Sequence, residues 1–180
     1  MKNYVKEGQK LPMFGIGPYL VLAMGILTLT GIILSGNILE SGILYGSWII
    51  VFRVLGIILM ITGVFVWYMG AFGSDMDDNI TENRLMTKGI YSWVRNPMYS
   101  GWWIIMIGLI LMFHNAWLLI IPVINWGIMT VVLMNTEEKW LLDLYKTEYE
   151  DYKKRVNRCI PFKRKERYRY EYIQFFLCRI

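Results

Sequence analysis

Histidine and cysteine are almost missing from this sequence. In 180 residues there is one histidine, His114, and there are two cysteines, Cys159 and Cys178. Both cysteines lie near the C-terminal end, so the sequence does not indicate a disulfide framework. His114 lies in a predicted tight turn, and we assign it no role. A glycine-rich dinucleotide fingerprint is also absent.

Three acidic residues, Asp75, Asp77 and Asp78, lie close together in one short stretch. Hard cations bind closely spaced carboxylates, but the stretch has neither the twelve-residue pattern of a calcium loop nor a nearby histidine. We therefore interpret it as a solvated loop and predict no metal site.

Charge is nearly absent from the first part of the chain, where residues 11–71 contain only Glu40 and Arg53. The whole sequence is 56% hydrophobic, with a mean hydropathy of +0.38. A soluble domain of this length rarely buries so much apolar surface, so the sequence predicts an all-α integral membrane protein. We expect about four transmembrane helices, the last two joined as a tight hairpin by "HNA". The expected spans are 13–35, 48–71, 98–113 and 116–134.

Basic residues gather at the N-terminus and after residue 138, whereas the first loop carries only Glu40. With four spans, the positive-inside rule places both termini and the 72–97 loop in the cytoplasm. The polar groups of the protein would then meet on one face of the membrane.

The segment "SWVRNPMYSGWW" places polar residues directly before the third apolar span. The residue before a proline avoids helical geometry and proline suits the first helical position, so we expect Asn96 as N-cap and Pro97 as the first helical residue. The free N–H groups of that helix start, with Arg95 beside them, suit a carboxylate or phosphate. The alternative is a plain helix start with Arg95 among lipid headgroups.

Glu137 and Glu138 end the fourth span, and apolar residues at helical spacing follow them. This pattern predicts that the span continues into an amphipathic helix at the cytoplasmic surface. The two carboxylates would point about 100° apart and would contact different groups. Otherwise they only mark the end of the span and face water.

The C-terminal tail is basic and rich in tyrosine. Interleaved basic and aromatic residues are found in nucleic-acid-binding proteins, but in a membrane protein the anionic headgroup layer is the better partner. We expect membrane lipids as partners and no nucleic acid.

In order, these segments resemble the isoprenylcysteine carboxyl methyltransferase family, which is related to the membrane phospholipid N-methyltransferases. The family pattern is G-x-Y-x-x-[VI]-R-H-P-x-Y-x-G, followed by an apolar hairpin, a pair of glutamates and a C-terminal signature. The resemblance covers about residues 67–162. The matching residues are Gly89, Tyr91, Val94, Arg95, Pro97, Tyr99, Gly101, Glu137, Glu138, Tyr149, Tyr152, Arg155, Val156, Pro161 and Phe162.

The resemblance implies a methyltransferase that binds S-adenosylmethionine on the cytoplasmic side and releases S-adenosylhomocysteine, with a lipophilic substrate entering from the bilayer. It divides the single domain into N-terminal transmembrane helices (1–66), a methyltransferase core (67–162) and a basic tail (163–180). We expect Glu138 and Arg155 to be catalytic, Glu138 as a proton acceptor. The expected cofactor-binding residues are Tyr91, Arg95, Asn96, Pro97, Tyr99, Gly101, Glu137 and Glu138.

Two departures from the family pattern leave the acceptor open. Asn96 stands in place of the histidine of the family, and "LMNTEE" lacks the arginine that many members carry before the glutamate pair. A carboxyl O-methyl acceptor is the first choice, and a phospholipid amine of the phosphatidylethanolamine type is the alternative. An NADPH-dependent membrane reductase and a non-enzymatic membrane scaffold are further alternatives.

Overall fold

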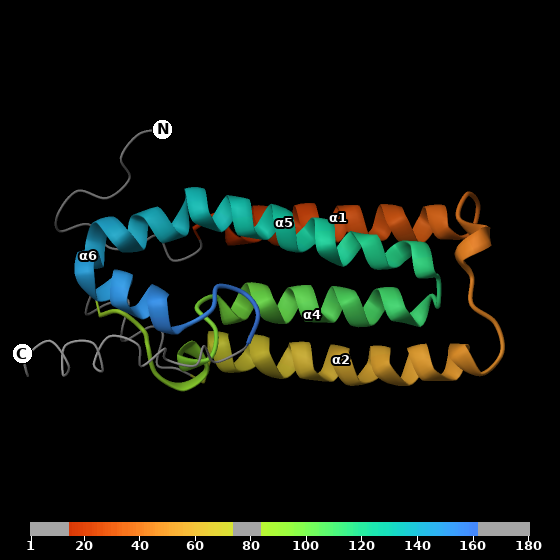
Figure 1. Ribbon diagram of the computed structural model, residues 1–180, viewed down its shortest axis with the longest axis horizontal. Coiled ribbons are helices and arrows are strands. Elements are labelled where there is room, and N and C mark those ends of the chain that lie inside the picture. The colour runs from red at the N-terminus through yellow and green to blue at the C-terminus, as the bar shows by residue number, and fades with distance from the viewer. Residues whose placement is uncertain (1–14, 74–83, 162–180) are drawn as a thin grey trace, which may run out of the picture.

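The regular elements of the protein are helices joined by short turns (Figure 1). The computed structural model describes residues 15–73 and 84–161. The helices are α1 (Gly17–Ser35), α2 (Ser47–Ala71), α4 (Pro97–Met112), α5 (Ile120–Asn135) and α6 (Glu137–Arg155). Short 3-10 turns are η1 (Glu40–Gly42), η2 (Gly89–Ser92) and η3 (Ala116–Leu119).

The four predicted apolar spans all form helices, with ends within a few residues of those expected. Three are long and apolar enough to cross a membrane, namely α1, α2 and the continuous stretch Ala116–Asn135. Helix α4 has 16 residues and is about 24 Å long at the usual helical rise, less than the roughly 30 Å of a bilayer core. The all-helical membrane fold is therefore confirmed with three helices of spanning length, and α4 is a shorter apolar helix.

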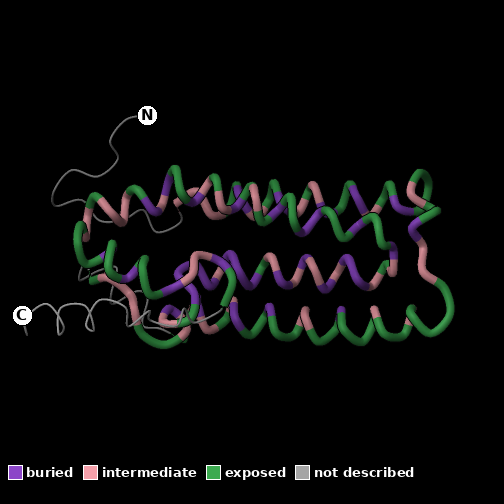
Figure 2. The backbone as a smooth tube through the Cα atoms, in the orientation of Figure 1, coloured by how far each residue is buried: buried purple, intermediate pink, exposed green. Residues whose placement is uncertain are grey.

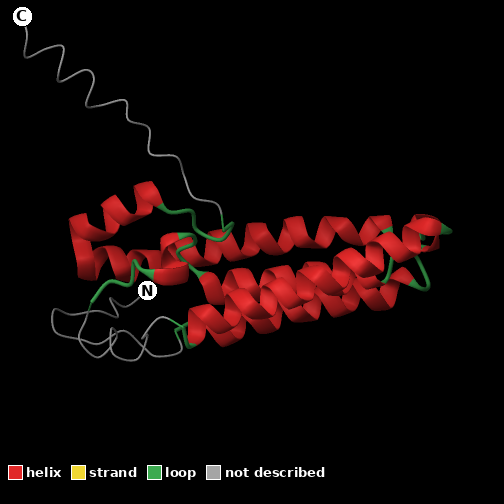
Figure 3. Cartoon of the chain, turned by 90° about the horizontal axis from the view of Figure 1, so that it is seen from below, coloured by secondary structure: helices red, strands yellow, loops and turns green. Residues whose placement is uncertain are grey.

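The helices lie along one long axis in two pairs, α1 beside α5 and α2 beside α4 (Figures 1 and 3). The outer side of α2 is exposed along its length (Figure 2). Most of its exposed side chains are apolar, among them Ile50, Val54, Ile58, Ile61 and Phe65, although Arg53 and Thr62 are exposed as well. An apolar surface of this length is suited to contact with lipid.

The closest helix packing is a glycine seam between α2 and α4, formed by Gly56, Gly63, Gly101 and Gly108. The glycines are seven residues apart on each helix and so share one face. A methyl group added at Gly63 would lie 2.7 Å from the carbonyl oxygen of Gly101, and one at Gly108 would lie 2.6 Å from that of Gly56. Because these are backbone contacts, the two helices can approach this closely only without side chains.

The other pair, α1 and α5, is joined by a buried polar contact inside the apolar bundle. Asn125 Nδ2 donates to Thr28 Oγ1 at 3.1 Å, and Thr28 Oγ1 donates to the carbonyl oxygen of Met24 at 2.8 Å. Trp103 of α4 donates its indole N–H to the carbonyl oxygen of Pro122 at 2.9 Å. Side chains, rather than backbone contacts, therefore hold α5 in place.

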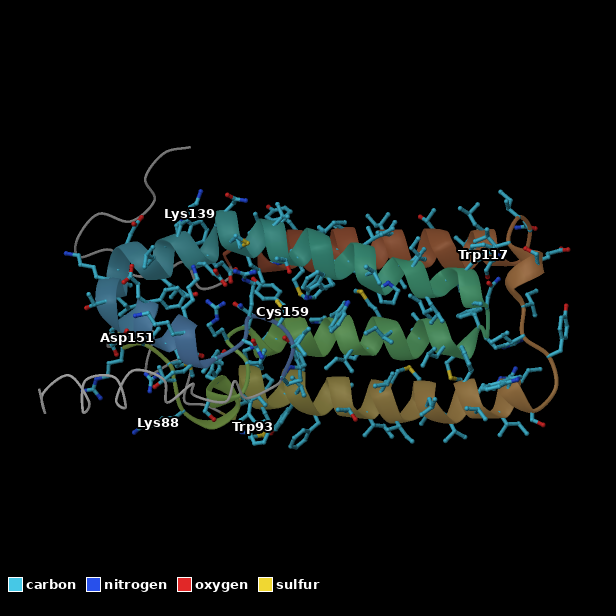
Figure 4. The ribbon with its side chains drawn as sticks, viewed as in Figure 1. Lys88, Trp93, Trp117, Lys139, Asp151 and Cys159 are labelled. Atoms are coloured by element: carbon cyan, nitrogen blue, oxygen red, sulfur yellow. The ribbon has the colours of Figure 1, made fainter. Side chains whose placement is uncertain are left out.

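The chain turns tightly between α4 and η3, as predicted from the "HNA" linker. Asn115 Nδ2 donates to the carbonyl oxygen of Leu39 at 2.9 Å, and its Oδ1 accepts the backbone N–H of Trp117 at 3.0 Å. Trp117 lies at this end of the bundle, whereas Lys139 and Asp151 lie at the other end (Figure 4). The charged residues Lys139 and Asp151 thus lie at the end of the bundle opposite the tight turn.

The amphipathic helix α6 departs from its predicted form. The sequence pattern predicts one helix continuous with the last span, but Thr136 has φ −123° and ψ −90°, which separates α6 from α5. Lys146 has φ 46° and ψ −119°, so α6 itself is sharply bent and its second arm turns back toward the bundle (Figure 1). That bend brings Tyr149 and Tyr152 back to the start of α4, which helical periodicity could not predict.

Candidate active site

The segment before α4 is held in place by the chain that follows α6. Val94 and Asn157 form an isolated parallel bridge. The backbone N–H of Arg95 donates to the carbonyl oxygen of Asn157 at 2.8 Å, and the N–H of Asn96 donates to that of Arg158 at 3.1 Å. These bonds bring two segments about sixty residues apart together at the end of the bundle.

Asn96 occupies the N-cap position of α4, as predicted, but its side chain does not cap the helix. Instead its Nδ2 donates to the carbonyl oxygen of Arg158 at 3.1 Å. The carbonyl of Asn96 accepts the backbone N–H and the hydroxyl of Ser100 at 3.0 and 2.9 Å. The asparagine side chain therefore anchors the segment after α6, which corrects the capping role expected from the sequence.

One carboxylate and three cations meet at this point in a charged cluster formed by Arg95, Glu138, Tyr149, Lys153 and Arg158. Arg95 Nη1 lies 3.0 Å from Glu138 Oε1 and donates to Tyr149 Oη at 3.2 Å. Arg158 donates two hydrogen bonds to Glu138, from Nη2 to Oε2 at 3.0 Å and from Nε to Oε1. Lys153 Nζ lies 3.7 Å from Oε2. Both oxygens of Glu138 are thus held by cations.

The electrostatics of the charged cluster favour ionised Glu138, whose side chain is only 4% exposed. Burial alone would raise its pKa, but the hydrogen bond from Arg158 and the charges of Arg95, Arg158 and Lys153 outweigh burial and hold the pKa below its usual value. Three cations surround a single carboxylate, so positive charge is in excess. Arg95 Nε is buried and has no hydrogen-bond partner within residues 15–73 and 84–161.

Glu137 faces a different environment, as the predicted divergence of the two carboxylates requires. It accepts a hydrogen bond from the hydroxyl of Tyr99 in α4 and another from the backbone N–H of Ile16, just before α1. Burial raises the pKa of Glu137, and these two hydrogen bonds lower it by less, so the net shift is upward. The neighbouring carboxyl groups therefore have pKa values displaced in opposite directions.

Tyr91 is hydrogen-bonded to residues of both α6 and α2. Tyr152 Oη donates to the carbonyl oxygen of Tyr91 at 2.6 Å, and Tyr91 Oη donates to the carbonyl oxygen of Gly70 in α2 at 3.2 Å. Burial, together with the charge of Glu137, raises the pKa of Tyr91 to about 12. This tyrosine links α6 to α2 and closes one side of the region.

Three residues expected in the site lie apart from the charged cluster. Pro97 packs on Gly70, and Gly101 belongs to the glycine seam. Arg155 is exposed and donates from Nε to the carbonyl oxygen of Asp151. Within residues 15–73 and 84–161 no group of three or more His, Cys, Asp or Glu is placed to hold a metal. Asp75, Asp77, Asp78, Phe162 and the tail 163–180 lie outside the described residues.

Sequence reasoning missed Arg158 and Lys153. Lys153 follows Tyr149 at helical spacing, so the face of α6 that it shares with Tyr149 was readable. Arg158 follows the end of α6, where periodicity gives no direction. Only its place within "RVNRCIPF", next to the residues that resemble the family signature, marked the segment as relevant.

Comparison with known proteins decides the family. The family described as phospholipid methyltransferase matches residues 44–148, more than half of the chain. The chain belongs to the phospholipid methyltransferase family. The match includes α2, α4, α5 and the first arm of α6, and so it contains Arg95, Glu137 and Glu138 but not Arg158.

Curated relatives of this family member are isoprenylcysteine methyltransferases, as the sequence resemblance predicted. Protein-S-isoprenylcysteine O-methyltransferase of Saccharomyces cerevisiae is 34% identical over 84 residues, which are 46% of this chain and 34% of that protein. The mouse protein of the same name is 34% identical over 80 residues, 44% of this chain and 28% of that protein. The Schizosaccharomyces pombe protein is 32% identical over 81 residues, with coverages of 44% and 34%. The matched region thus spans about a third of each relative. No solved structure gives a significant match.

Proposed function

We propose that this protein is a membrane methyltransferase that transfers a methyl group from S-adenosylmethionine to a lipophilic acceptor. The observation that carries the proposal is the pairing of Arg95 and Arg158 with Glu138 at the end of an apolar helical bundle, with Asn96 bonded to the Arg158 carbonyl oxygen. The membership in the phospholipid methyltransferase family and the names of the curated relatives support the same reaction class.

The residues at this end of the bundle have the chemistry that such a donor needs. S-adenosylmethionine carries a carboxylate, an ammonium group, ribose hydroxyls and an adenine. The excess of cations in the charged cluster, and the buried Arg95 Nε without a partner in the described part of the chain, suit its carboxylate. Glu137 and Glu138 suit the ammonium group or the ribose, and Tyr91 and Tyr99 would line the same region.

The donor supplies an activated methyl group on sulfur, which is displaced in line and requires alignment and exclusion of water. Tyr149 and Tyr152 are almost fully buried, and Tyr149 accepts a hydrogen bond from Arg95, so these rings would keep water from that side of Arg95. Of the two carboxyl groups, Glu137 is the better proton acceptor, because burial raises its pKa whereas the surrounding cations lower the pKa of Glu138. We therefore move this role from Glu138, where the sequence placed it, to Glu137. The role expected of Arg155 would require it to leave its exposed position.

For the acceptor we favour a carboxyl group on a prenylated cysteine, the substrate class that the names of the relatives indicate. A phospholipid amine is the second candidate. Two observations favour it: the family description, and the raised pKa of Glu137, which would let this residue take the proton that an amine loses. The acceptor would enter sideways from the bilayer, and we place both termini and the site in the cytoplasm from the charge distribution.

The first test is the binding of S-adenosylhomocysteine, measured by calorimetry on the purified protein in detergent. We expect saturable binding that Glu137→Gln weakens about tenfold or more, as expected for a lost charged hydrogen bond. Glu150→Gln, at an exposed position on the second arm of α6, is the matched control and should bind normally. A folded protein that does not bind the ligand would refute the proposal, and NADPH binding in a parallel titration would then favour the reductase.

The second test separates the acceptors. The protein would be incubated with S-adenosylmethionine carrying a labelled methyl group and with either N-acetyl-S-farnesylcysteine or phosphatidylethanolamine vesicles. Base-labile label on the prenylcysteine would establish a methyl ester, and base-stable label in the lipid would establish N-methylation. Label in neither would exclude both acceptors.

A further inference from the structure

The most unusual feature of the charged cluster is that Glu138 has more partners than it needs. Arg95, Lys153 and Arg158 all contact one carboxylate. If Arg158 moved away, Glu138 would keep the buried Arg95 at 3.0 Å and would not become an unpaired charge. Loss of a single partner is usually costly for a buried carboxylate, but this one has a replacement.

Of the two arginines that pair with Glu138, Arg158 is the one better placed to move. Its side chain is 19% exposed, compared with 6% for Arg95. It lies after the end of α6, outside any helix. Its backbone is nevertheless fixed, because its carbonyl oxygen accepts both the N–H and the Nδ2 of Asn96 at 3.1 Å. The guanidinium group can therefore swing about an anchored Cα.

The geometry points to Arg158 as a donor-binding residue that acts by ion-pair exchange with Glu138. This inference rests on the proposed function. An α-amino acid carries an ammonium and a carboxylate side by side, which are the counterparts of the two halves of a Glu–Arg pair. Inserted between them, the ammonium group of the donor replaces Arg158 on Glu138, and the carboxylate of the donor receives the released guanidinium. No bond is made or broken, and the number of ion pairs does not fall.

The pairing of charges explains why a zwitterion, such as the amino-acid part of the donor, suits the position between Glu138 and Arg158. A ligand with only an ammonium group would displace Arg158 from Glu138 and leave the guanidinium without a counterion. A ligand with only a carboxylate would have to compete with Glu138 for Arg158. Only a ligand with both charges satisfies both partners, since a bidentate guanidinium–carboxylate pair is re-formed with the ligand. Asn96 then acts as a positioning residue, because it fixes the backbone from which Arg158 moves.

The test compares ligands that differ in the amino-acid part, measured by calorimetry on the full chain in detergent. The ligands are S-adenosylhomocysteine, its decarboxylated analogue and 5′-methylthioadenosine, which lacks the whole amino-acid part. The variants are Arg158→Gln and Arg158→Lys, with Lys154→Gln as the matched control, because Lys154 is an exposed cation that pairs with Asp151 and has no expected role in the site.

We expect Arg158→Gln to weaken S-adenosylhomocysteine binding about tenfold or more. Binding of the decarboxylated analogue should not weaken, because in this variant the analogue displaces no guanidinium group from Glu138. The ratio of the two affinities, which favours the carboxylated ligand in the wild type, would therefore fall in the variant. The protein change and the ligand change together form a double-mutant cycle that measures the coupling between Arg158 and the ligand carboxylate. Arg158→Lys should keep part of the preference, and Lys154→Gln all of it. If Arg158→Gln fails to fold, as judged by gel filtration and thermal unfolding, the test is the affinity ratio of the two ligands for Arg158→Lys compared with that of the wild type.

Two outcomes overturn the inference while the proposed function stands. In the first, the variant keeps the wild-type preference between the two ligands. In the second, it loses affinity for both ligands equally, which would indicate a purely structural ion pair. A wild-type protein that binds none of the three ligands would instead remove the proposed function and this inference with it.

Discussion

The glycine seam and the charged cluster hold the same bundle together by opposite means. In the glycine seam, α2 and α4 touch through backbone atoms, and no charged group takes part. In the charged cluster, three segments meet through one carboxylate and three cations. The first contact depends on shape alone, and the second on complementary charge.

The difference indicates which part of the protein can change state. Close packing of two helices is lost when atoms are added, and it has no alternative arrangement of similar energy. Ion pairs can exchange partners, provided that no charge is left alone. A rigid α2–α4 pair next to an exchangeable charged cluster is a suitable arrangement for binding a polar ligand beside a membrane.

The largest expected effect comes from neutralising the central carboxylate. Glu138→Gln leaves Arg95 buried without a full counter-charge, so we expect the free energy of unfolding to fall by about 3–5 kcal/mol. It would be measured by unfolding with a denaturing detergent. Glu150→Gln, at an exposed position, should stay within about 0.5 kcal/mol. A Glu138→Gln protein as stable as this control would show that the charged cluster contributes nothing to stability.

A smaller effect is expected from adding one methyl group to the glycine seam. In Gly101→Ala the new Cβ would lie 2.7 Å from the carbonyl oxygen of Gly63, and backbone atoms cannot turn aside, so we expect a loss of about 1–3 kcal/mol. Gly127→Ala is the control, because nothing lies within 4 Å of a methyl group there. The same unfolding measurement applies. Equal stability of the two variants would mean that α2 and α4 are less closely packed than described.

The smallest expected effect is the pH dependence, in which the two glutamates act in opposite directions. Folding raises the pKa of Glu137, so its contribution to stability increases as the pH falls from neutral toward its ordinary pKa of about 4.5. Folding lowers the pKa of Glu138, so its contribution is full above about 4.5 and is lost as the pH falls further. Thermal unfolding between pH 3 and 8 should therefore show a maximum in the mildly acidic range.

Glu137→Gln is the variant that isolates the first of these contributions. It should remove the rise in stability between neutral pH and about 4.5 and leave the loss at lower pH in place. Were the rise to persist in this variant, some other group would be responsible for it.

The sequence by itself determined the class of the protein and the positions of its helices. Apolar runs specify where helices lie, because a segment without charges is stable in a bilayer only with its backbone bonded internally. The predicted spans 48–71 and 116–134 therefore agree closely with the observed helices. The seven-residue spacing of Gly101 and Gly108 places both on one face of a helix and favours close packing there, but it does not identify α2 as the partner.

Only the tertiary structure decided which polar groups meet. Arg158 reaches Glu138, and Asn96 anchors Arg158, because α6 bends at Lys146 and the chain returns to pair with residues 94–96. Neither the bend nor the pairing has a periodic signal, since periodicity reports which face of a helix is apolar and not where a chain turns back. Arg95, Glu137 and Glu138 were thus readable from local patterns, whereas the place of Arg158 and the charge balance of the cluster arose from contacts between residues far apart in the chain.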